Sequence, residues 1–317
     1  MNGVIDLGEH RGLSVITLGV AAGPAIRGPE NGMATAIVVD DAFYLVDFGI
    51  GCTRAAAEAG LVGDALRAGF ITHLHSDHVA ELPGYLLFNW GAPVQGIQRP
   101  IMIYGPASDR ADADGPLAGT RDLVSGLLSA YYYDIDIRQV DEGRPPFTEL
   151  LTVEELAPGD EAFDVYRDDR VRVRAVRVDH PPIEQAFAFR FDTDYGSVTL
   201  SGDTAFCQRL ADLAQGSDLL VHEAVNLGYY EELGFAGAFL DHQRNSHSHP
   251  RDAGRIAQSA GVHHLILSHF AGRADTSWWR DMAAETFTGD ISVASSGDVF
   301  TTAAASALHK GTIITGS

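Results

Sequence analysis

Four potential metal ligands lie within six residues of one another at the end of an apolar run. The run Phe70-Ile71-Thr72 leads directly into His73, His75, Asp77 and His78. Because side chains alternate along an extended chain, His73 and His75 point to the same side of a strand end and can bind one ion. Asp77 and His78 follow on a turn, from which they can reach a second ion. Imidazole and carboxylate ligands predict zinc, with iron or manganese as alternatives.

Three further candidate ligands each follow the end of an apolar run elsewhere in the chain. They are His180, Asp203 and His269. Open sheets place their functional loops just past the carboxyl ends of the strands, so these side chains are expected at one edge with the first motif. Together they would complete the coordination of two ions.

The elements that must position these residues are short strands alternating with alanine-rich helices, a pattern typical of an α/β protein. Strands are predicted at 13–18, 35–39, 43–46, 68–72, 101–104, 171–178, 186–191, 197–201, 219–222, 264–268 and 291–294. Helices are predicted at 53–59, 117–131, 208–215, 250–260 and 277–286. The region from about 105 to 169 is more acidic and reads as an insertion.

Several motifs together resemble the metallo-β-lactamase superfamily, in the branch containing ribonuclease Z and the arylsulfatase-like hydrolases. The resemblance covers nearly the whole chain except about 105–169. Besides the ligands already named, it is carried by Leu45-Val46-Asp47-Phe48-Gly49, Ser201-Gly202-Asp203-Thr204, Leu220-Val221-His222-Glu223-Ala224 and Leu265-Ile266-Leu267-Ser268-His269-Phe270.

This resemblance implies a fold and an assignment of ligands. The fold is a four-layer αββα sandwich formed by residues 1–317 as one domain, with 105–170 as an insertion that caps the active site. By the resemblance, the first zinc is held by His73, His75 and His180, the second by Asp77, His78 and His269, and Asp203 bridges them. Asp77 is expected to serve in catalysis as well as in metal binding, and Asp47 to support the metal loop.

One histidine outside the ligand set is a candidate catalytic residue. The stretch Ser246-His247-Ser248-His249 precedes a predicted helix and resembles the segment that carries a functional histidine in this branch. His247 is predicted to protonate the leaving group or to bind the developing oxyanion. Glu223 could orient His247, and a purely structural role for Glu223 is the alternative. His242 and His249 are interpreted as ordinary loop histidines.

The charge of the chain argues against a polyanionic substrate. Forty-three acidic residues face 22 basic ones, which gives a net charge of −21, and Lys310 is the only lysine. Such a surface repels nucleic acid unless positive charge is concentrated in one patch. A nucleic-acid partner is therefore predicted to be unlikely, and a small-molecule ester is predicted as the substrate.

The sequence also predicts the compartment and the assembly of the protein. Two cysteines are too few for a disulfide framework, the N-terminus does not resemble a signal peptide, and no apolar stretch is long enough to cross a membrane. The prediction is a cytoplasmic protein without a membrane partner, with a homodimer as a possible assembly.

The predicted function is hydrolysis of a small-molecule ester, such as an aryl sulfate or a phosphodiester, by a hydroxide bound to two metal ions. The alternatives are a ribonuclease Z-like endonuclease that processes tRNA 3′ ends, a lactonase, and a metal-binding module without catalysis. Apolar and aromatic residues of the insertion would face the substrate, unless they pack in the core: Leu127, Leu128, Tyr131, Tyr132 and Tyr133.

Overall fold

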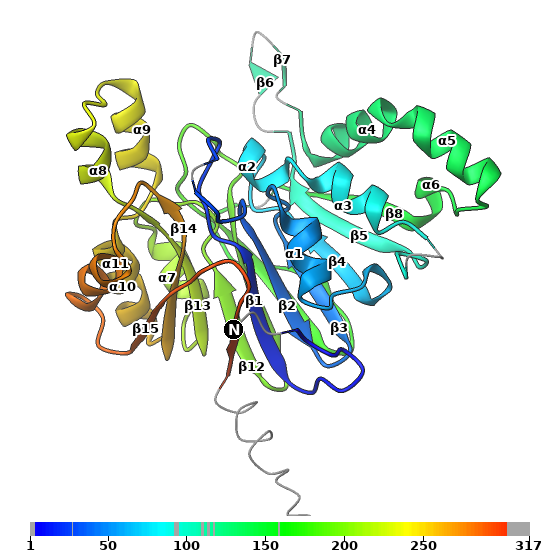
Figure 1. The fold of residues 1–317 in the computed structure, drawn as a ribbon. Coiled ribbons are helices and arrows are strands. Elements are labelled where there is room, and N and C mark those ends of the chain that lie inside the picture. Colours follow the sequence, from blue (N-terminus) through cyan, green and yellow to red (C-terminus); the bar gives the residue numbers. More distant parts are fainter. Residues whose placement is uncertain are drawn as a thin grey trace, which may run out of the picture.

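The computed structural model describes residues 4–302 apart from 27, 92–94, 109–110, 113–114, 117 and 158. Two seven-stranded sheets lie face to face, and helices cover their outer faces (Figure 1). This arrangement is the four-layer αββα sandwich that the resemblance implies. Within the described ranges, no helix combines the length and the apolar character needed to cross a membrane.

The first sheet is antiparallel at one side and parallel at the other, where β3, β4, β5 and β8 run in the same direction. Its strands, in spatial order, are β16 (Asp298–Thr301), β1 (Leu13–Gly19), β2 (Ala34–Val39), β3 (Ala42–Val46), β4 (Leu66–Phe70), β5 (Ile101–Pro106) and β8 (Leu151–Leu156).

The second sheet is also mixed, with β12 to β15 parallel and β9 to β12 antiparallel. Its strands, in spatial order, are β15 (Asp290–Val293), β14 (His264–Ala271), β13 (Leu219–Val225), β12 (Gly196–Leu200), β11 (Phe187–Thr193), β10 (Val171–Arg177) and β9 (Phe163–Arg167). A further two-stranded ribbon pairs β6 (Ala111–Asp112) with β7 (Gly115–Pro116).

Helices pack on the outer face of each sheet. The first sheet is covered by α1 (Cys52–Glu58), α3 (Leu82–Phe88), α4 (Thr120–Ala130) and α6 (Phe147–Leu150), and the second by α7 (Gln208–Leu213), α10 (Pro250–Ala260) and α11 (Thr276–Ala284). The remaining helical elements are η1 (Gly63–Ala65), α2 (Ser76–Val79), α5 (Tyr132–Asp141), α8 (Leu227–Glu232) and α9 (Ala238–Ser246).

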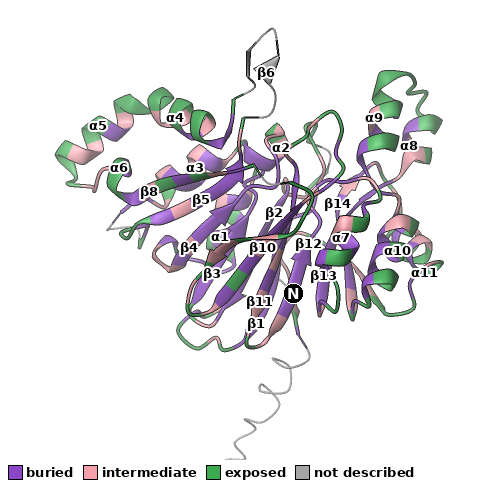
Figure 2. Cartoon of the chain, turned by 180° about the vertical axis from the view of Figure 1, so that it is seen from behind, coloured by how far each residue is buried: buried purple, intermediate pink, exposed green. Residues whose placement is uncertain are grey.

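Aromatic packing between the two sheets holds them together. Phe70 of the first sheet contacts Phe189 and Phe191 of the second, with ring centroids 5.4 and 5.3 Å apart. All three rings are fully buried, and Figure 2 shows the strands as the buried centre of the molecule. Each buried aromatic side chain contributes about 2–3 kcal/mol of hydrophobic stabilisation. A rigid double sheet therefore supports the loops at its edge.

The region 105–169 is more closely tied to the sheets than an insertion would be. It supplies β8, which pairs with β5, and β9, which pairs with β10. Helices α2, α3, α5, α6, α8 and α9 are absent from the sequence prediction. The proposed role of 105–170 as a cap over the site stays a prediction.

The aromatic cluster of this region divides between two environments. Leu127 and Leu128 are partly buried against the first core, whereas Tyr131, Tyr132 and Tyr133 are 45, 65 and 81 % exposed. The alternative that the tyrosines pack in the core is therefore wrong. They lie at the junction of α4 and α5, where the chain extends away from the sheet (Figure 1).

Candidate metal centre

The seven predicted ligands meet at one edge of the sandwich. His73 and His75 lie on the segment between β4 and α2, Asp77 and His78 lie on α2, and the other three come from the second sheet and its loops. The structure forms two main groups of potential ligand atoms, each lying within 4.8 Å of one another: His73, His75, His180 and Asp203 in one, and Asp77, His78 and His269 in the other.

The spacing of the first group fits a tetrahedral ion. His75 Nδ1 lies 3.0 Å from His73 Nε2 and 3.3 Å from His180 Nε2. Bonds of about 2.0–2.1 Å in tetrahedral geometry place neighbouring ligand nitrogens about 3.3 Å apart. Three imidazoles brought this close, with nitrogens facing one another, therefore suit a shared cation.

Asp203 lies between the two groups. Its Oδ2 is 3.7 Å from His73 Nε2 and 3.3 Å from His269 Nε2. Its Oδ1 is 3.4 Å from His78 Nε2, yet this buried oxygen has no hydrogen-bond partner among the described residues. A buried carboxylate oxygen without a donor is costly unless a cation lies beside it. The environment of Asp203 thus fits a bridging ligand.

The second group is built by a β-bulge. His78 Nε2 and His269 Nε2 are 3.3 Å apart, and Asp77 Oδ2 is 3.5 Å from His269. In the register of β13 and β14, Glu223 is opposite Ser268 and Ala224 is opposite Phe270. His269 is therefore the extra residue, and its φ of 43° lies in the left-handed region. Bulges turn side chains in this way beside active sites.

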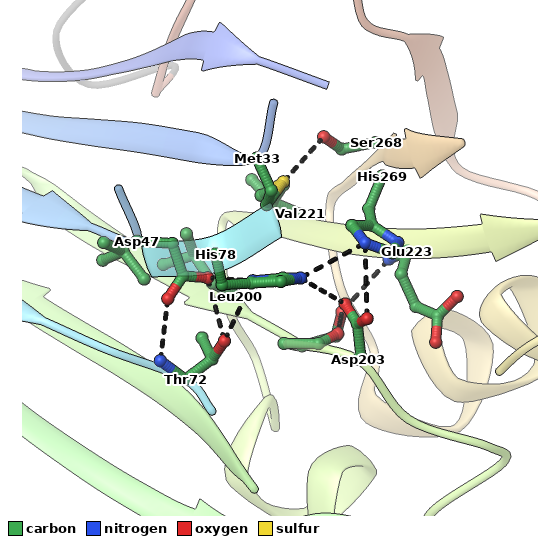
Figure 3. Close-up of a pocket in the computed structure, with 13 residues that line it drawn as sticks. Met33, Asp47, Thr72, His78, Leu200, Asp203, Val221, Glu223, Ser268 and His269 are labelled. Atoms are coloured by element: carbon green, nitrogen blue, oxygen red, sulfur yellow. Dashed lines mark hydrogen bonds and ion pairs between the residues drawn. The ribbon is translucent and has the colours of Figure 1, made fainter. Parts of the chain in front are cut away.

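Asp47 fixes the orientation of His78 from behind (Figure 3). Its Oδ2 lies 2.8 Å from His78 Nδ1, and its two oxygens accept hydrogen bonds from the backbone and the hydroxyl of Thr72. With Nδ1 engaged, Nε2 is the nitrogen left to face Asp203 and His269. Ligating histidines need such partners, and the supporting role expected of Asp47 agrees with this contact.

Two backbone groups that the sequence analysis missed also hold ligands. The Ser246 carbonyl lies 2.8 Å from His180 Nδ1, and the Gly23 N–H donates to Asp77 Oδ2 at 2.8 Å. A Cβ at Gly23 would lie only 2.3 Å from Asp77 Cβ, so glycine is required there. Main-chain contacts over such sequence separations carry no local signal.

His247 and Glu223 form a buried pair beside the ligands. His247 Nδ1 lies 3.1 Å from Glu223 Oε1, and the same oxygen accepts a hydrogen bond from the Thr204 N–H. Burial disfavours the imidazolium, but the Glu223 carboxylate outweighs burial and raises the pKa of His247 to about 9. The contact places Glu223 where it orients His247.

The electrostatics of three of the ligands favour metal binding. Burial lowers the pKa of His73 well below its usual value and that of His180 to about 3, which leaves both imidazoles neutral. Burial opposes ionisation of Asp203, but the surrounding histidines hold its pKa well below the usual range. Neutral imidazoles and an ionised carboxylate are the forms that coordinate cations.

His242 is not the ordinary loop residue that the sequence analysis expects. It lies on α9, with its ring centroid 5.4 Å from that of His247 and 5.7 Å from that of His180. His249 instead caps α10, where its side chain accepts from the Arg251 N–H. Helical periodicity placed His242 on the side of α9 that faces the ligands.

Comparisons with known proteins agree with this architecture. The model of the beta-lactamase superfamily domain matches residues 117–270. Ribonuclease Z of Mycobacterium bovis (strain BCG / Pasteur 1173P2) is 33 % identical over 290 residues, covering 88 % of this chain and 94 % of the relative. Ribonuclease Z of Mycobacterium marinum (strain ATCC BAA-535 / M) is 32 % identical over 285 residues, covering 87 % and 94 %.

Solved structures show the same fold at lower identity. The metallo-beta-lactamase fold protein YhfI from Bacillus subtilis has a TM-score of 0.65 and 19 % identity, covering 91 % of this chain and 99 % of its own. The short form of human tRNase Z has a TM-score of 0.65 and 21 % identity, with the same coverage.

These relatives overturn the predicted partners. The names of these relatives, ribonuclease Z and tRNase Z, indicate a nucleic-acid substrate. They contradict the prediction of a small-molecule ester as substrate and the prediction that nucleic acid is an unlikely partner. Net charge misled because it describes the field of the whole surface, whereas divalent ions held by these ligands would provide local positive charge at one phosphate. The chain belongs to the ribonuclease Z family, and it is a metallo-β-lactamase-superfamily hydrolase that acts on ester bonds with divalent metal ions.

Proposed function

We propose that this protein is a phosphodiesterase that processes the 3′ end of precursor tRNA. The observation that carries the proposal is the buried His247–Glu223 pair next to two groups of converging ligands. The names of its relatives indicate RNA as the substrate class. A processing enzyme of this kind must release a 3′-hydroxyl, so we take O3′ as the leaving oxygen.

The proposed cofactors are two zinc ions. His73, His75 and His180 would hold one, Asp77, His78 and His269 the other, with Asp203 between them. When bound, such a pair lowers the pKa of water and stabilises charge developing on the phosphoryl group. The predominance of imidazole nitrogen over carboxylate oxygen supports zinc over manganese or magnesium.

His247 is the proposed general acid. Its Nδ1 is held by Glu223, so Nε2 is free to reach a substrate in the pocket that the residue lines. With a pKa near 9, the side chain is an imidazolium at neutral pH. In the proposed reaction water adds to phosphorus and releases a proton to solvent, the P–O3′ bond breaks, and the proton of His247 Nε2 passes to O3′. The downstream fragment keeps a 5′-phosphate.

Asp77, which lines the same pocket, is also proposed to act in catalysis. The Gly23 N–H holds its Oδ2, and its pKa is held below the usual range because His269 and His78 outweigh burial. The carboxylate is thus ionised and fixed in position for metal binding and for orienting the attacking water. The cytoplasm is the proposed compartment, which the two free, buried cysteines Cys52 and Cys207 support.

The test is cleavage of a precursor tRNA that carries a 3′ extension, by zinc-loaded protein, with both product ends mapped. We expect one cut that leaves a 3′-hydroxyl upstream and a 5′-phosphate downstream. The Asp203→Ala variant, shown to be folded by circular dichroism, should give no product. Cuts scattered over unrelated single-stranded positions, or an uncleaved precursor, would overturn the proposal.

A further inference from the structure

Helix α9 forms one wall of the pocket over the metal ligands. The pocket has a volume of about 290 Å³ and contains, besides the ligands, Phe239, His242 and Gln243 of this helix. Phe239 and His242 are three residues apart, so they lie on the same face of the helix. In Figure 1, α8 and α9 stand at the same end of the sheets as α2, which carries Asp77 and His78.

Phe239 presents a partly exposed aromatic ring that is supported by two neighbouring aromatic rings. It remains 36 % exposed, yet its ring packs against Tyr230 and Phe235 with centroids 5.0 and 4.8 Å away. Such a supported ring loses little entropy on binding a flat ligand. Single-stranded RNA is recognised largely by stacking of unpaired bases on aromatic side chains. Phe239 therefore offers a platform for one base at the mouth of the pocket.

His242 has one ring nitrogen engaged and one left over. Its Nδ1 lies 3.1 Å from Ser246 Oγ, and that hydroxyl donates its own hydrogen to the Pro181 carbonyl. Ser246 Oγ must therefore accept from His242, which assigns the Nδ1 proton. Nε2 is the nitrogen available to a ligand in the pocket. A ribose hydroxyl both donates and accepts, so it pairs with Nε2 in either protonation state.

We propose that Phe239 and His242 form a subsite for the nucleoside whose 3′ oxygen leaves, with the base stacked on Phe239 and the 2′-hydroxyl bound by His242. The inference rests on the proposed function. The His242 ring lies 5.4 Å from that of His247, the proposed acid for O3′. Because the 2′-hydroxyl is adjacent to O3′ on the ribose, a group beside the acid is the one placed to contact it. His242 would thus distinguish RNA from DNA at the cleavage position.

The experiment compares two substrates that differ by one atom. One is the all-ribose precursor, and the other has a single 2′-deoxynucleotide directly upstream of the scissile phosphate. We expect the wild-type kcat/KM to be about tenfold lower on the deoxy substrate, the size of one lost hydrogen bond. His242→Asn places an amide where Nδ1 was, keeps the bond to Ser246, and should cleave both substrates at the same reduced rate. His242→Gln places its amide near Nε2 and should restore part of the tenfold difference.

The stacking of a base on Phe239 is tested with variants of α8 and α9. Phe239→Leu should raise KM for the all-ribose precursor about tenfold, whereas Phe239→Trp should stay within about threefold of wild type. Leu233→Ala is the matched control, because Leu233 is 58 % exposed at the C-terminal end of α8 and lies outside the pocket. Melting temperature and zinc content of each variant exclude unfolding and metal loss as causes.

The outcomes separate the two claims. If wild-type protein cleaves the precursor but His242→Asn keeps the full tenfold preference for ribose, the subsite is wrong and the proposed function stands. An unchanged KM for Phe239→Leu would overturn the stacking part in the same way. If wild-type protein cleaves neither substrate, the proposed function and the subsite fall together.

Discussion

The imidazole of His247 lies 3.1 Å from the Glu223 carboxylate, and both side chains are buried beside the metal ligands. A buried carboxylate is costly to maintain unless it is paired, so this contact has a functional consequence. In the proposed mechanism, this contact keeps His247 in the protonated form and leaves the opposite ring nitrogen to face the substrate. We therefore propose that Glu223 is a positioning residue that acts through His247.

The first prediction concerns the leaving group. His247→Ala should lower the kcat for RNA cleavage by about 10² to 10⁴, because O3′ leaves as a poor alkoxide unless it is protonated. The loss on bis(p-nitrophenyl) phosphate should be far smaller, since p-nitrophenolate leaves without a proton. His263→Ala is the control, because His263 is 74 % exposed. Equal losses on both substrates would contradict general-acid catalysis by His247.

A second prediction concerns the hydrogen bond from the Gly23 N–H to Asp77. Gly23→Ala brings a Cβ within 2.3 Å of Asp77 Cβ, so the loop or the ligand must shift. We expect zinc at one of the two sites to bind about 10- to 100-fold more weakly, the usual cost of disturbing a ligand's support. Competition with a fluorescent chelator measures this affinity. The matched control is Gly126→Ala in α4, where the added methyl meets no atom within 4 Å. Wild-type zinc affinity at both sites in Gly23→Ala would show that Gly23 does not hold Asp77 in place for metal binding.

The third prediction concerns stability and pH. Asp168 accepts hydrogen bonds from the hydroxyls of Tyr44 and Tyr166, which link the two sheets, and from the N–H groups of Arg170 and Val171. Burial opposes ionisation of Asp168, but these donors lower its pKa. A lowered pKa means that the stabilisation is complete above the unfolded-state value of about 4 and is lost as the pH falls through the folded-state value.

Asp168→Asn should therefore reduce the free energy of unfolding by about 1–3 kcal/mol at pH 7 and flatten its dependence on pH below about 4. Urea unfolding between pH 3 and 7 measures both effects. Asp169→Asn removes an exposed carboxylate at the neighbouring position and should cost less than about 1 kcal/mol. An acid dependence of Asp168→Asn as steep as that of wild type would show that Asp168 is not responsible.

Salt dependence is the fourth prediction. Most described arginines are paired with carboxylates, as Arg172 is with Asp164 and Arg251 with Glu285. Few cations are left to neutralise RNA phosphates, so log kcat/KM should fall with log salt concentration by a slope of only about −1 to −2. Steady-state kinetics from about 50 to 300 mM potassium chloride measures the slope. A slope steeper than about −4 would mean that a basic surface forms on binding.

Local patterns in the sequence account for most of the fold and for the location of the site. His180 and Asp203 each follow a run that forms a strand, and His269 lies near the end of β14, so a prediction from strand ends could bring the three together without knowledge of the sheet order. The strand predicted at 68–72 is β4, displaced by two residues at each end.

What the sequence could not predict depends on packing between distant segments. The position of His242 follows from how α9 lies against the loop of His180, and the bulge at His269 follows from the register of two strands. Helix α5 was missed because most of its apolar side chains are exposed. Tyr133 and Val140 are 81 and 83 % accessible, and Ile135 alone is buried, so no buried stripe marks the helix. The substrate class was predicted wrongly because it was inferred from net charge, which is a property of the whole surface.

The central claim is that two divalent ions at this edge of the sandwich are both needed for phosphodiester cleavage. The most direct test is to add zinc to metal-free protein in steps and to measure bound metal and precursor cleavage at each step. We predict saturation at two ions per chain, with cleavage rising mainly as the second ion binds. Full activity at one ion per chain, or two bound ions without cleavage of the precursor, would contradict the account.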